Sequence, residues 1–368
     1  MTRDEVEASA RLTGRAAAGV AQHAQRIHTA IARRVFGPLE PGAARVALAH
    51  DVIAGAAYSA MPTPLIFAGT AVGAALAATT PTSARPLSAN RAGGIAQSVL
   101  NGLIGADLAA VADPLAIRMA MRHDGDDVEL STGGLAEAFP DATAYVVVLI
   151  HGLFEDDASW GGVFGRQLRD DVGCTAVHVR YNTGRAIADN GADLDGLLCS
   201  LVDRWPVPVE RLALVGHSMG GLVARSACRK GADTGARWVP LLSDVVSLAS
   251  PHRGARLAVL IGAAGRGLRR VPEAAPWAAL VDHSPGVRDL QRGLDVQGVP
   301  TARHHLVWSA LDGAAGVLLG DLLVHPRSAR GCDHVDAVQV SGLDHFALLT
   351  HPEVYNALRT WLSAPSAS

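Results

Sequence analysis

The sequence is poor in lysine, aromatic residues and cysteine. Lys230 is the only lysine among 32 basic residues, aromatic residues make up 4% of the chain, and the net charge is −3 with no basic block. Because nucleic-acid-binding proteins concentrate lysine and arginine on one face, this composition argues against a nucleic-acid partner. The four cysteines form no CxxC pair and no metal-ligand spacing, so we predict free thiols and no metal site.

Charge is absent from one long stretch, between Asp51 and Arg85. Pro62 and Pro64 interrupt this stretch and leave about 15 residues, fewer than the roughly 20 that a membrane span needs. We therefore predict close-packed helices of small residues in a soluble protein, with a peripheral membrane contact or an oligomerising hairpin as the alternative. The N-terminus lacks the apolar segment of a signal peptide, which makes the cytoplasm the expected location.

The chain divides by pattern into two parts. Residues 1–115 are rich in alanine and glycine, with apolar residues at helical spacing, and predict a helical N-terminal domain. From 116 to 365 strand and helix patterns alternate, which predicts an α/β domain with a mostly parallel central sheet and helices on both faces. The segment 254–300 has no strand pattern, and we interpret it as a lid inserted into this domain. The strands are expected at 145–150, 174–180, 211–215, 244–249, 304–310 and 336–341, and the helices at 186–204, 219–230 and 352–363.

A strand–turn–helix pattern surrounds Ser218. Four apolar residues, 212–215, are followed by Gly-His-Ser-Met-Gly and then by a helical pattern. This order is typical of a nucleophile elbow, in which a sharp turn exposes a serine at the top of the sheet. Side chains at Gly216 and Gly220 would collide with neighbouring backbone, so both positions are expected to require glycine. We interpret Ser218 as a nucleophile.

A serine nucleophile also needs N–H donors for the oxyanion that forms. The segment His151–Phe154 directly follows the predicted strand 145–150, where such a donor loop is expected. We predict that the backbone amides of Leu153 and Met219 are the two donors. The other residues expected at the elbow and the substrate pocket are His151, Gly152, Phe154 and His217.

The general base and its acid partner are expected late in the chain. His345 lies between the last predicted strand and the last helix, and we predict that it takes the proton from the serine hydroxyl. The acid should follow the penultimate strand, where Asp321 and Asp312 are the candidates. We favour Asp321, because Asp312 stands in an Asp-Gly turn directly after the strand.

These segments together resemble the α/β-hydrolase lipases and esterases, nearest to bacterial lipase-like and PGAP1-like proteins. The resemblance covers about 116–365 and is carried by the segments His151–Leu153, Tyr181–Arg185, Gly216–Gly221, Ser250–Gly254, Gly320–Val324 and Asp344–His345. It departs from the family around the acid, where Leu322 and His325 replace a glycine and a proline.

The resemblance implies hydrolysis of carboxylic esters, lipid-like or acyl, through an acyl-serine intermediate and without a cofactor. The expected partner is a small-molecule or lipid ester. One alternative is an acyltransferase or thioesterase that uses the same triad. A second alternative is a membrane-associated scaffold whose hydrolase domain is vestigial.

Overall fold

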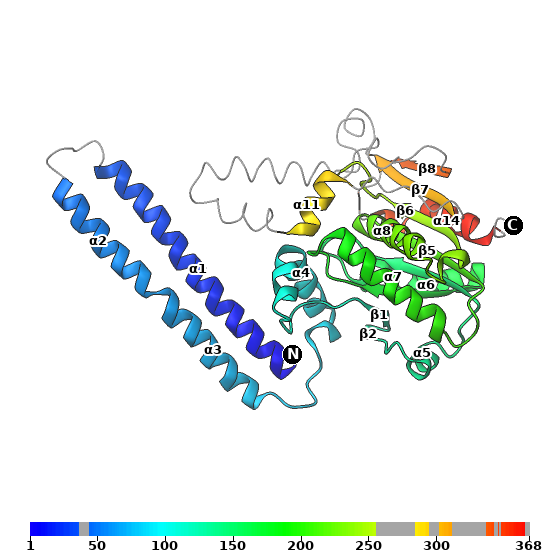
Figure 1. The fold of residues 1–368 in the computed structure, drawn as a ribbon, viewed down its shortest axis with the longest axis horizontal. Coiled ribbons are helices and arrows are strands. Elements are labelled where there is room, and N and C mark those ends of the chain that lie inside the picture. The colour runs from blue at the N-terminus through cyan, green and yellow to red at the C-terminus, as the bar shows by residue number, and fades with distance from the viewer. Residues whose placement is uncertain are drawn as a thin grey trace. The chain divides into compact units, whose positions relative to one another are not determined.

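The computed structural model describes residues 1–36, 44–254, 284–293, 302–310, 336–341, 345 and 347–364. These residues form two compact units (Figure 1). The first contains Met1–Leu87 and Ala112–Leu115, and the second contains Ser88–Val111 and the described residues from Ala116 onward. The second unit carries the sheet expected from the alternating patterns.

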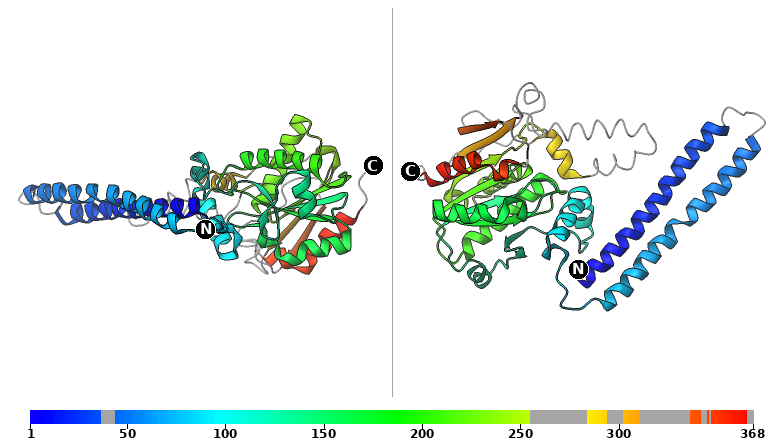
Figure 2. Two further views of the ribbon diagram at one scale, coloured as in Figure 1. Left: turned by 90° about the horizontal axis from the view of Figure 1, so that it is seen from below. Right: turned by 180° about the vertical axis from the view of Figure 1, so that it is seen from behind.

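The first unit is a pair of long antiparallel helical arms. Helix α1 (Arg3–Phe36) lies alongside α2 (Ala44–Ala60) and α3 (Pro62–Thr79), as Figures 1 and 2 show. Helix α2 ends just before Pro62 because proline fits only the first turn of the helix that follows. The backbones of α1 and α3 approach closely: a Cβ at Gly69 would lie 2.6 Å from the Ala10 carbonyl oxygen. Small residues therefore set the distance between these two helices, as the composition predicts.

The α2–α3 arm exposes apolar side chains. Within the described residues, Ala54–Thr79 is the one segment long and apolar enough to cross a membrane by length and composition, with a mean hydropathy of 1.5. Only 11% of its most apolar window is buried. The large apolar side chains exposed on this arm are Val52, Met61, Ile66, Phe67, Val72 and Leu76. The arm is therefore only partly covered by its packing against α1.

Eight described strands form one sheet in the order β2-β1-β4-β3-β5-β6-β7-β8. Strand β1 is antiparallel to β2 and β4, and all other neighbours are parallel. The strands are β1 (Ala120–His123), β2 (Asp126–Asp127), β3 (Tyr145–Ile150), β4 (Thr175–Arg180), β5 (Arg211–His217), β6 (Leu242–Leu248), β7 (Arg303–Ala310) and β8 (Asp336–Ser341). The predicted mostly parallel sheet is confirmed.

Helices cover both faces of this sheet. Along β3, Val146 and Val148 belong to one apolar core and Val147 and Leu149 to the other, which explains why the strand is a continuous apolar run. The first core includes residues of α7 (Ile187–Arg204) and α8 (Met219–Thr234), and the second includes residues of α6 (Gly161–Val172) and α14 (Pro352–Ser363). The remaining elements of this unit are α4 (Arg91–Ala110), α5 (Thr132–Ala138), α11 (Pro285–Arg292) and the short 3-10 turns Asp157–Trp160, Val239–Leu241 and Ala347–Thr350.

Helix α4 belongs to the second unit, whereas the sequence pattern places it in an N-terminal domain that ends at 115. The helix packs through small and polar residues against loops that follow β3 and β4. The Asn182 amide donates a hydrogen bond of 2.9 Å to the Gly105 carbonyl, and a Cβ at Gly105 would lie 2.1 Å from the Asn182 oxygen. An alanine- and glycine-rich composition does not reveal which neighbour a helix packs against, so the sequence alone grouped α4 with α1–α3.

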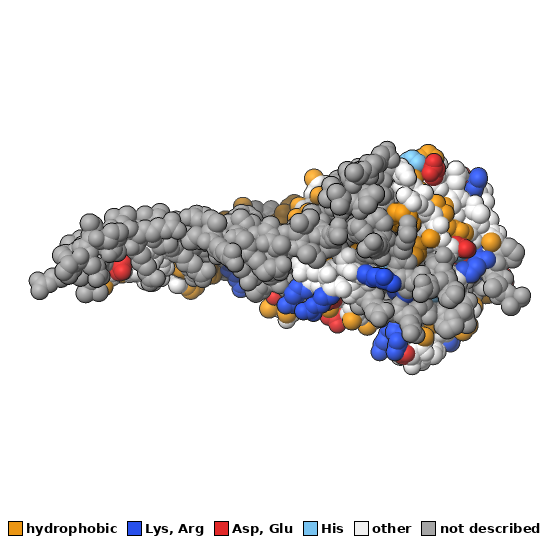
Figure 3. All heavy atoms as spheres, turned by 90° about the horizontal axis from the view of Figure 1, so that it is seen from above, with side chains coloured by type: hydrophobic (Ala, Val, Ile, Leu, Met, Phe, Trp, Pro, Cys, Tyr) orange, Lys and Arg blue, Asp and Glu red, His pale blue; other side chains and the backbone are white. Residues whose placement is uncertain are grey.

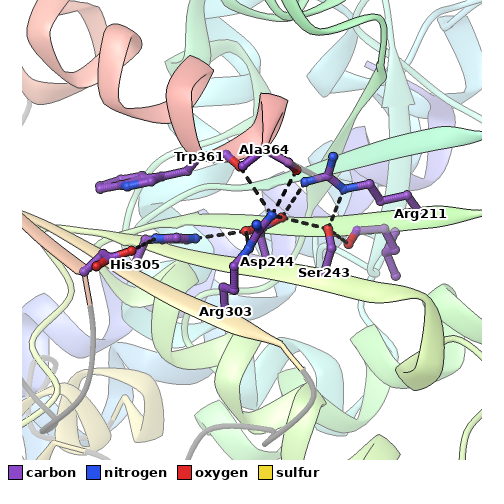
Figure 4. A network of polar contacts seen from close by, with 9 residues as sticks. Arg211, Ser243, Asp244, Arg303, His305, Trp361 and Ala364 are labelled. Atoms are coloured by element: carbon purple, nitrogen blue, oxygen red, sulfur yellow. Dashed lines mark hydrogen bonds and ion pairs between the residues drawn. The ribbon is translucent and has the colours of Figure 1, made fainter. Parts of the chain in front are cut away.

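A buried carboxylate ties three strands together where they begin. Asp244 on β6 accepts hydrogen bonds from Arg211 on β5 (2.9 Å) and from Arg303 (2.9 Å) and His305 (2.9 Å) on β7 (Figure 4). His305 stacks on Trp361 of α14 with ring centroids 4.5 Å apart. The cluster therefore holds β5, β6, β7 and α14 together at the end of the sheet where the strands begin, opposite the predicted site.

The Asp244 carboxylate is held in its ionised form. Burial alone would raise its pKa, but hydrogen bonds from His305, Arg303, Ser243 and Arg211 hold the pKa well below its usual range. The contribution of Asp244 to stability is therefore fully present above the unfolded carboxyl pKa of about 3.9 and is lost as the pH falls toward its lower folded value.

Charged side chains are dispersed over the described part of the face shown in Figure 3. In the face shown in Figure 3, the described arginines are interspersed with acidic, apolar and polar side chains. This distribution accords with the small net charge of −3.

We predict that Asp244→Asn lowers the free energy of unfolding by about 3–5 kcal/mol, because the arginine charges lose their buried partner. Asp233→Asn, which removes an exposed pair with Arg229, is the matched control and should cost at most about 1 kcal/mol. Urea unfolding at neutral pH measures both effects. Between about pH 4 and 2 the deficit of Asp244→Asn should shrink, and a deficit that is constant with pH would contradict this account.

Candidate active site

Ser218 lies in a strained turn between β5 and α8. Its backbone has φ 51° and ψ −118°, a region that side-chain-bearing residues rarely adopt. The turn is tight because backbone meets backbone: a Cβ at Gly216 would lie 2.3 Å from the Gly221 nitrogen, and one at Gly220 would lie 2.2 Å from the Ile150 oxygen. Both positions need glycine, and the side chain of Ser218 is held at the carboxyl end of the central strands.

The start of α8 favours negative charge beside Ser218. Met219 is the first residue of this helix, and the first N–H groups of a helix have no intrahelical acceptor. The helix dipole adds a partial positive charge at the same end. Ser218 itself is fixed by a hydrogen bond of 2.8 Å from its N–H to the Leu248 carbonyl. The Met219 amide is thus a suitable oxyanion donor by its position, and its use as one stays a prediction.

The loop after β3 passes next to the serine. A Cβ at Gly152 would lie 3.0 Å from the Ser218 Cβ, so only a glycine allows this approach without displacement. Phe154 has φ 64°, another strained backbone, and its N–H donates to the Thr183 hydroxyl at 3.4 Å. Leu153 lies between these residues and packs against the first core. The second predicted oxyanion donor therefore lies in a constrained loop beside the serine.

His151 is a structural part of this loop. The side chain is fully buried, and burial lowers its pKa, so the ring is neutral. Its Nδ1 lies 2.9 Å from the Gly152 carbonyl, and its Nε2 accepts a hydrogen bond of 3.4 Å from the Tyr181 N–H. The Tyr181 hydroxyl donates to the His151 carbonyl at 2.8 Å. Both ring nitrogens are thus engaged in shaping the loop.

His345 is brought to the elbow from 128 residues away. Its side chain is buried, its carbonyl accepts a hydrogen bond of 3.1 Å from His217 Nε2, and the two rings lie with centroids 4.8 Å apart. His345, the predicted base, therefore lies beside His217, the residue that precedes Ser218. Asp321 and Asp312, the candidates for the acid, lie outside the described residues, as do 255–283 and 294–300 of the predicted lid.

The described part of the predicted lid is Gly254, α11 and the residue at each end of α11. The Asp289 carboxylate accepts a hydrogen bond of 2.9 Å from the Ile187 N–H at the start of α7. A Cβ at Gly286 would lie 2.1 Å from the Thr183 carbonyl and 3.1 Å from the Met219 Cε. Helix α11 therefore packs against the loop that follows β4 and against the start of α8, beside Ser218.

Sequence reasoning missed Glu155. Its carboxylate accepts hydrogen bonds from the Gly152 N–H (2.7 Å) and from His217 Nδ1 (3.0 Å). Burial would raise its pKa, but the charge and hydrogen bond of His217, together with the Gly152 N–H, lower it to about 2. The sequence offered one signal, an acidic residue three positions after the glycine of the donor loop, and no pattern connected it to His217.

A second omission is the support that α4 gives to the site. A Cβ at Gly102 would lie 2.1 Å from the Phe154 ring, and one at Gly184 would lie 2.1 Å from the Asn101 carbonyl. The buried residues of α4 recur at helical spacing, namely Gly93, Gln97, Ser98, Asn101, Gly102, Gly105 and Leu108. This helix face of small and polar residues was the signal that the sequence offered for the role of α4.

Among the described residues no group of three His, Cys, Asp or Glu side chains is placed to hold a metal ion.

Residues 198–261, which include the serine turn, match the PGAP1-like alpha/beta domain family. No curated protein shows a significant match to the chain. The chain is similar to the crystal structure of the Bacillus licheniformis lipase BlEst2 in its propeptide form, with a TM-score of 0.50 and 18% identity over 68% of this chain and 54% of that one.

Two further similarities are weaker in TM-score. The mature form of BlEst2 has a TM-score of 0.47 and 19% identity over 67% of this chain and 98% of that one. The RedJ thioesterase of the prodiginine pathway in Streptomyces coelicolor has a TM-score of 0.38 and 15% identity over 60% and 88%. At these identities the likeness concerns the fold alone.

We predict that Gly220→Ala destabilises the protein by about 1–3 kcal/mol or more, because its methyl group meets the Ile150 carbonyl and neither backbone can yield. Gly196→Ala is the matched control: it lies on α7 with no atom within 4 Å of its Cβ position, and should stabilise by up to about 1 kcal/mol. Thermal and urea unfolding measure both. Equal melting of Gly220→Ala and wild type would contradict the tight turn.

Proposed function

We propose that this chain, which has the α/β-hydrolase fold, is a serine hydrolase that cleaves carboxylic esters through an acyl-serine intermediate. The family match and the sheet confirm the α/β-hydrolase fold that the motifs implied. One observation carries the proposal: Ser218 is held in a strained strand-to-helix turn, and buried His345 stands beside the preceding residue. Nucleophilic catalysis by serine requires a base within hydrogen-bond reach of the hydroxyl, and the proposal gives this role to His345.

The reaction assigns one role to each group. His345 takes the proton from the Ser218 hydroxyl while the oxygen attacks the ester carbonyl. The amides of Leu153 and Met219 bind the oxyanion, and the leaving alcohol receives the proton from His345. Water then hydrolyses the acyl-serine with His345 again as the base. In this proposal Asp321 orients the His345 ring and stabilises its charged form.

The surroundings of the serine favour an apolar acyl group. Leu153, Phe154 and Met219 are the apolar side chains that stand on the two segments adjoining Ser218. Met219 is buried in the first core and Leu153 packs against it, so the segments beside Ser218 are apolar. An apolar acyl group suits such surroundings better than a charged one, which would lose its hydration there.

We predict that Ser218→Ala abolishes both fluorophosphonate labelling and the turnover of p-nitrophenyl esters. Removal of the nucleophile should lower kcat by several orders of magnitude, leaving only the residual rate from binding and the oxyanion donors. The acyl chain is varied from acetyl to palmitoyl to find the preferred length, and acyl thioesters are assayed in parallel to separate esterase from thioesterase. A wild-type protein that neither labels nor turns over any of these substrates would refute the proposal.

We also propose that the α2–α3 arm contacts a lipid surface. The support is its uncharged sequence from 52 to 84, its length, and the exposure of Phe67 and Val72. Burial of an apolar helix surface between lipid headgroups contributes free energy that grows with the apolar area buried, and α3 carries no charged residue that would oppose it. Such a contact would bring the enzyme to a lipid ester.

We predict that the protein cosediments with vesicles of phosphatidylcholine and phosphatidylglycerol, and that the double variant Phe67→Ser/Val72→Ser loses this binding at unchanged melting temperature. Val111→Ser, an equally exposed apolar residue of the second unit, is the control and should bind normally. Wild-type protein that stays in solution would contradict the lipid contact. Concentration-dependent dimerisation by size-exclusion chromatography would then assign the surface to a second copy.

A further inference from the structure

A buried ion pair adjoins the proposed active site. The Glu155 carboxylate lies 3.0 Å from His217 Nδ1, with the histidine fully buried and the carboxylate 9% exposed. On its other side, His217 Nε2 lies 3.1 Å from the His345 carbonyl. Neither Glu155 nor the ring of His217 takes part in a chemical step of the reaction proposed above. The burial of this ion pair beside the proposed active site therefore needs another explanation.

The partners of His217 define its protonation. A carboxylate and a backbone carbonyl are both acceptors, so each ring nitrogen of His217 must carry a hydrogen to bond them. The pKa of Glu155, lowered to about 2, means that this carboxylate is ionised at neutral pH. The geometry therefore makes His217 an imidazolium, and the two residues form a buried charged pair.

The other titratable groups around the pair do not replace this charge. Burial lowers the pKa of His151 and raises that of Tyr181, so both are neutral. His345 stands on the far side of the His217 ring. Within the described residues around it, Glu155 thus depends on His217 for compensation, and removal of His217 leaves the buried carboxylate without this charged partner.

The pair connects three segments of the site. Glu155 binds the N–H of Gly152, the glycine that passes beside Ser218 and precedes Leu153. His217 directly precedes Ser218 in the chain. Its ring then binds the backbone of His345. The donor loop, the nucleophile turn and the base are thereby joined through two side chains.

We propose that the Glu155–His217 ion pair is a positioning element for catalysis, which holds the oxyanion loop, the nucleophile turn and the base loop in one arrangement. This inference rests on the proposed serine hydrolase function. Neither residue reacts with the substrate. Their charge strengthens two hydrogen bonds to the backbone, and the geometry of the transition state depends on where that backbone lies.

The test replaces Glu155 with its neutral isostere. Glu155→Gln should lower kcat for p-nitrophenyl esters by about 10–100-fold, the cost of a misplacement of about 1 Å, while KM stays unchanged. The double variant Glu155→Gln/His217→Gln should be no slower than the slower single variant, because the two residues act as a unit. Asp156→Asn is the matched control, since Asp156 caps its own turn through the Ala158 N–H and asparagine caps equally well.

The charge state is measured separately by NMR of protein labelled with ¹⁵N-histidine, with the His217 signals assigned from His217→Gln. In wild type both ring nitrogens of His217 should remain protonated at about pH 8, well above the ordinary histidine pKa of about 6.5, and in Glu155→Gln the ring should be neutral there. If Glu155→Gln does not fold, His217→Gln, which keeps an amide donor, takes its place in the kinetic test.

The possible outcomes separate the two ideas. Normal kcat in Glu155→Gln, or a neutral His217 in wild type, would overturn the positioning role while the hydrolase function stands. A wild type without labelling or turnover would refute the hydrolase function and the positioning role together, and the NMR spectra would still show whether the pair is charged.

Discussion

The turn at Ser218 is the constraint on which the rest of the second unit depends. Three backbone segments meet there, the end of β5, the start of α8 and the end of β3, at distances that exclude even a Cβ atom at Gly216 and Gly220. The positive φ of the serine costs free energy, of order 1–3 kcal/mol for such a conformation, and the surrounding sheet and helix must supply it. Parallel strands covered on both faces provide that rigid support.

Buried charged side chains have different roles at the two ends of the parallel strands. Where the strands begin, Asp244 is surrounded by donors from neighbouring strands and serves to fix their order. Where they end, Glu155 and His217 neutralise each other and reach into three loops that surround Ser218. The first cluster joins regular elements to each other, whereas the second joins loops, whose positions the sheet alone does not determine.

Helix α4 lies outside the repeating strand–helix pattern of the sequence, yet its contacts support the candidate site. Its glycines admit the Phe154 ring and the Asn182 amide to the helix surface, so the loops after β3 and β4 are each supported from outside the sheet. Helices α1–α3 use glycine in another way, to bring helix against helix. The same composition therefore serves two purposes in neighbouring parts of the chain.

The sequence by itself determined the elements that depend on local pattern. The apolar run of β3, the glycines around Ser218 and the strand and helix alternation are each readable because their physical causes, burial on both faces and backbone clash, act on adjacent residues. The position of His345 between the last strand and the last helix was also readable, because it follows from the order of these elements along the chain. The choice between Asp321 and Asp312 concerns residues outside those described.

Only the tertiary structure decided what depends on distant partners. Glu155 is an ordinary acidic residue in the sequence, and its meaning comes from His217, 62 positions away. The proximity of His345 to His217 and the assignment of α4 to the second unit likewise follow from packing. Electrostatic pairing has no period along the chain, because it depends on which side chains the fold brings together. The small residues of α4 do recur at helical spacing, but that spacing does not reveal which neighbour they pack against.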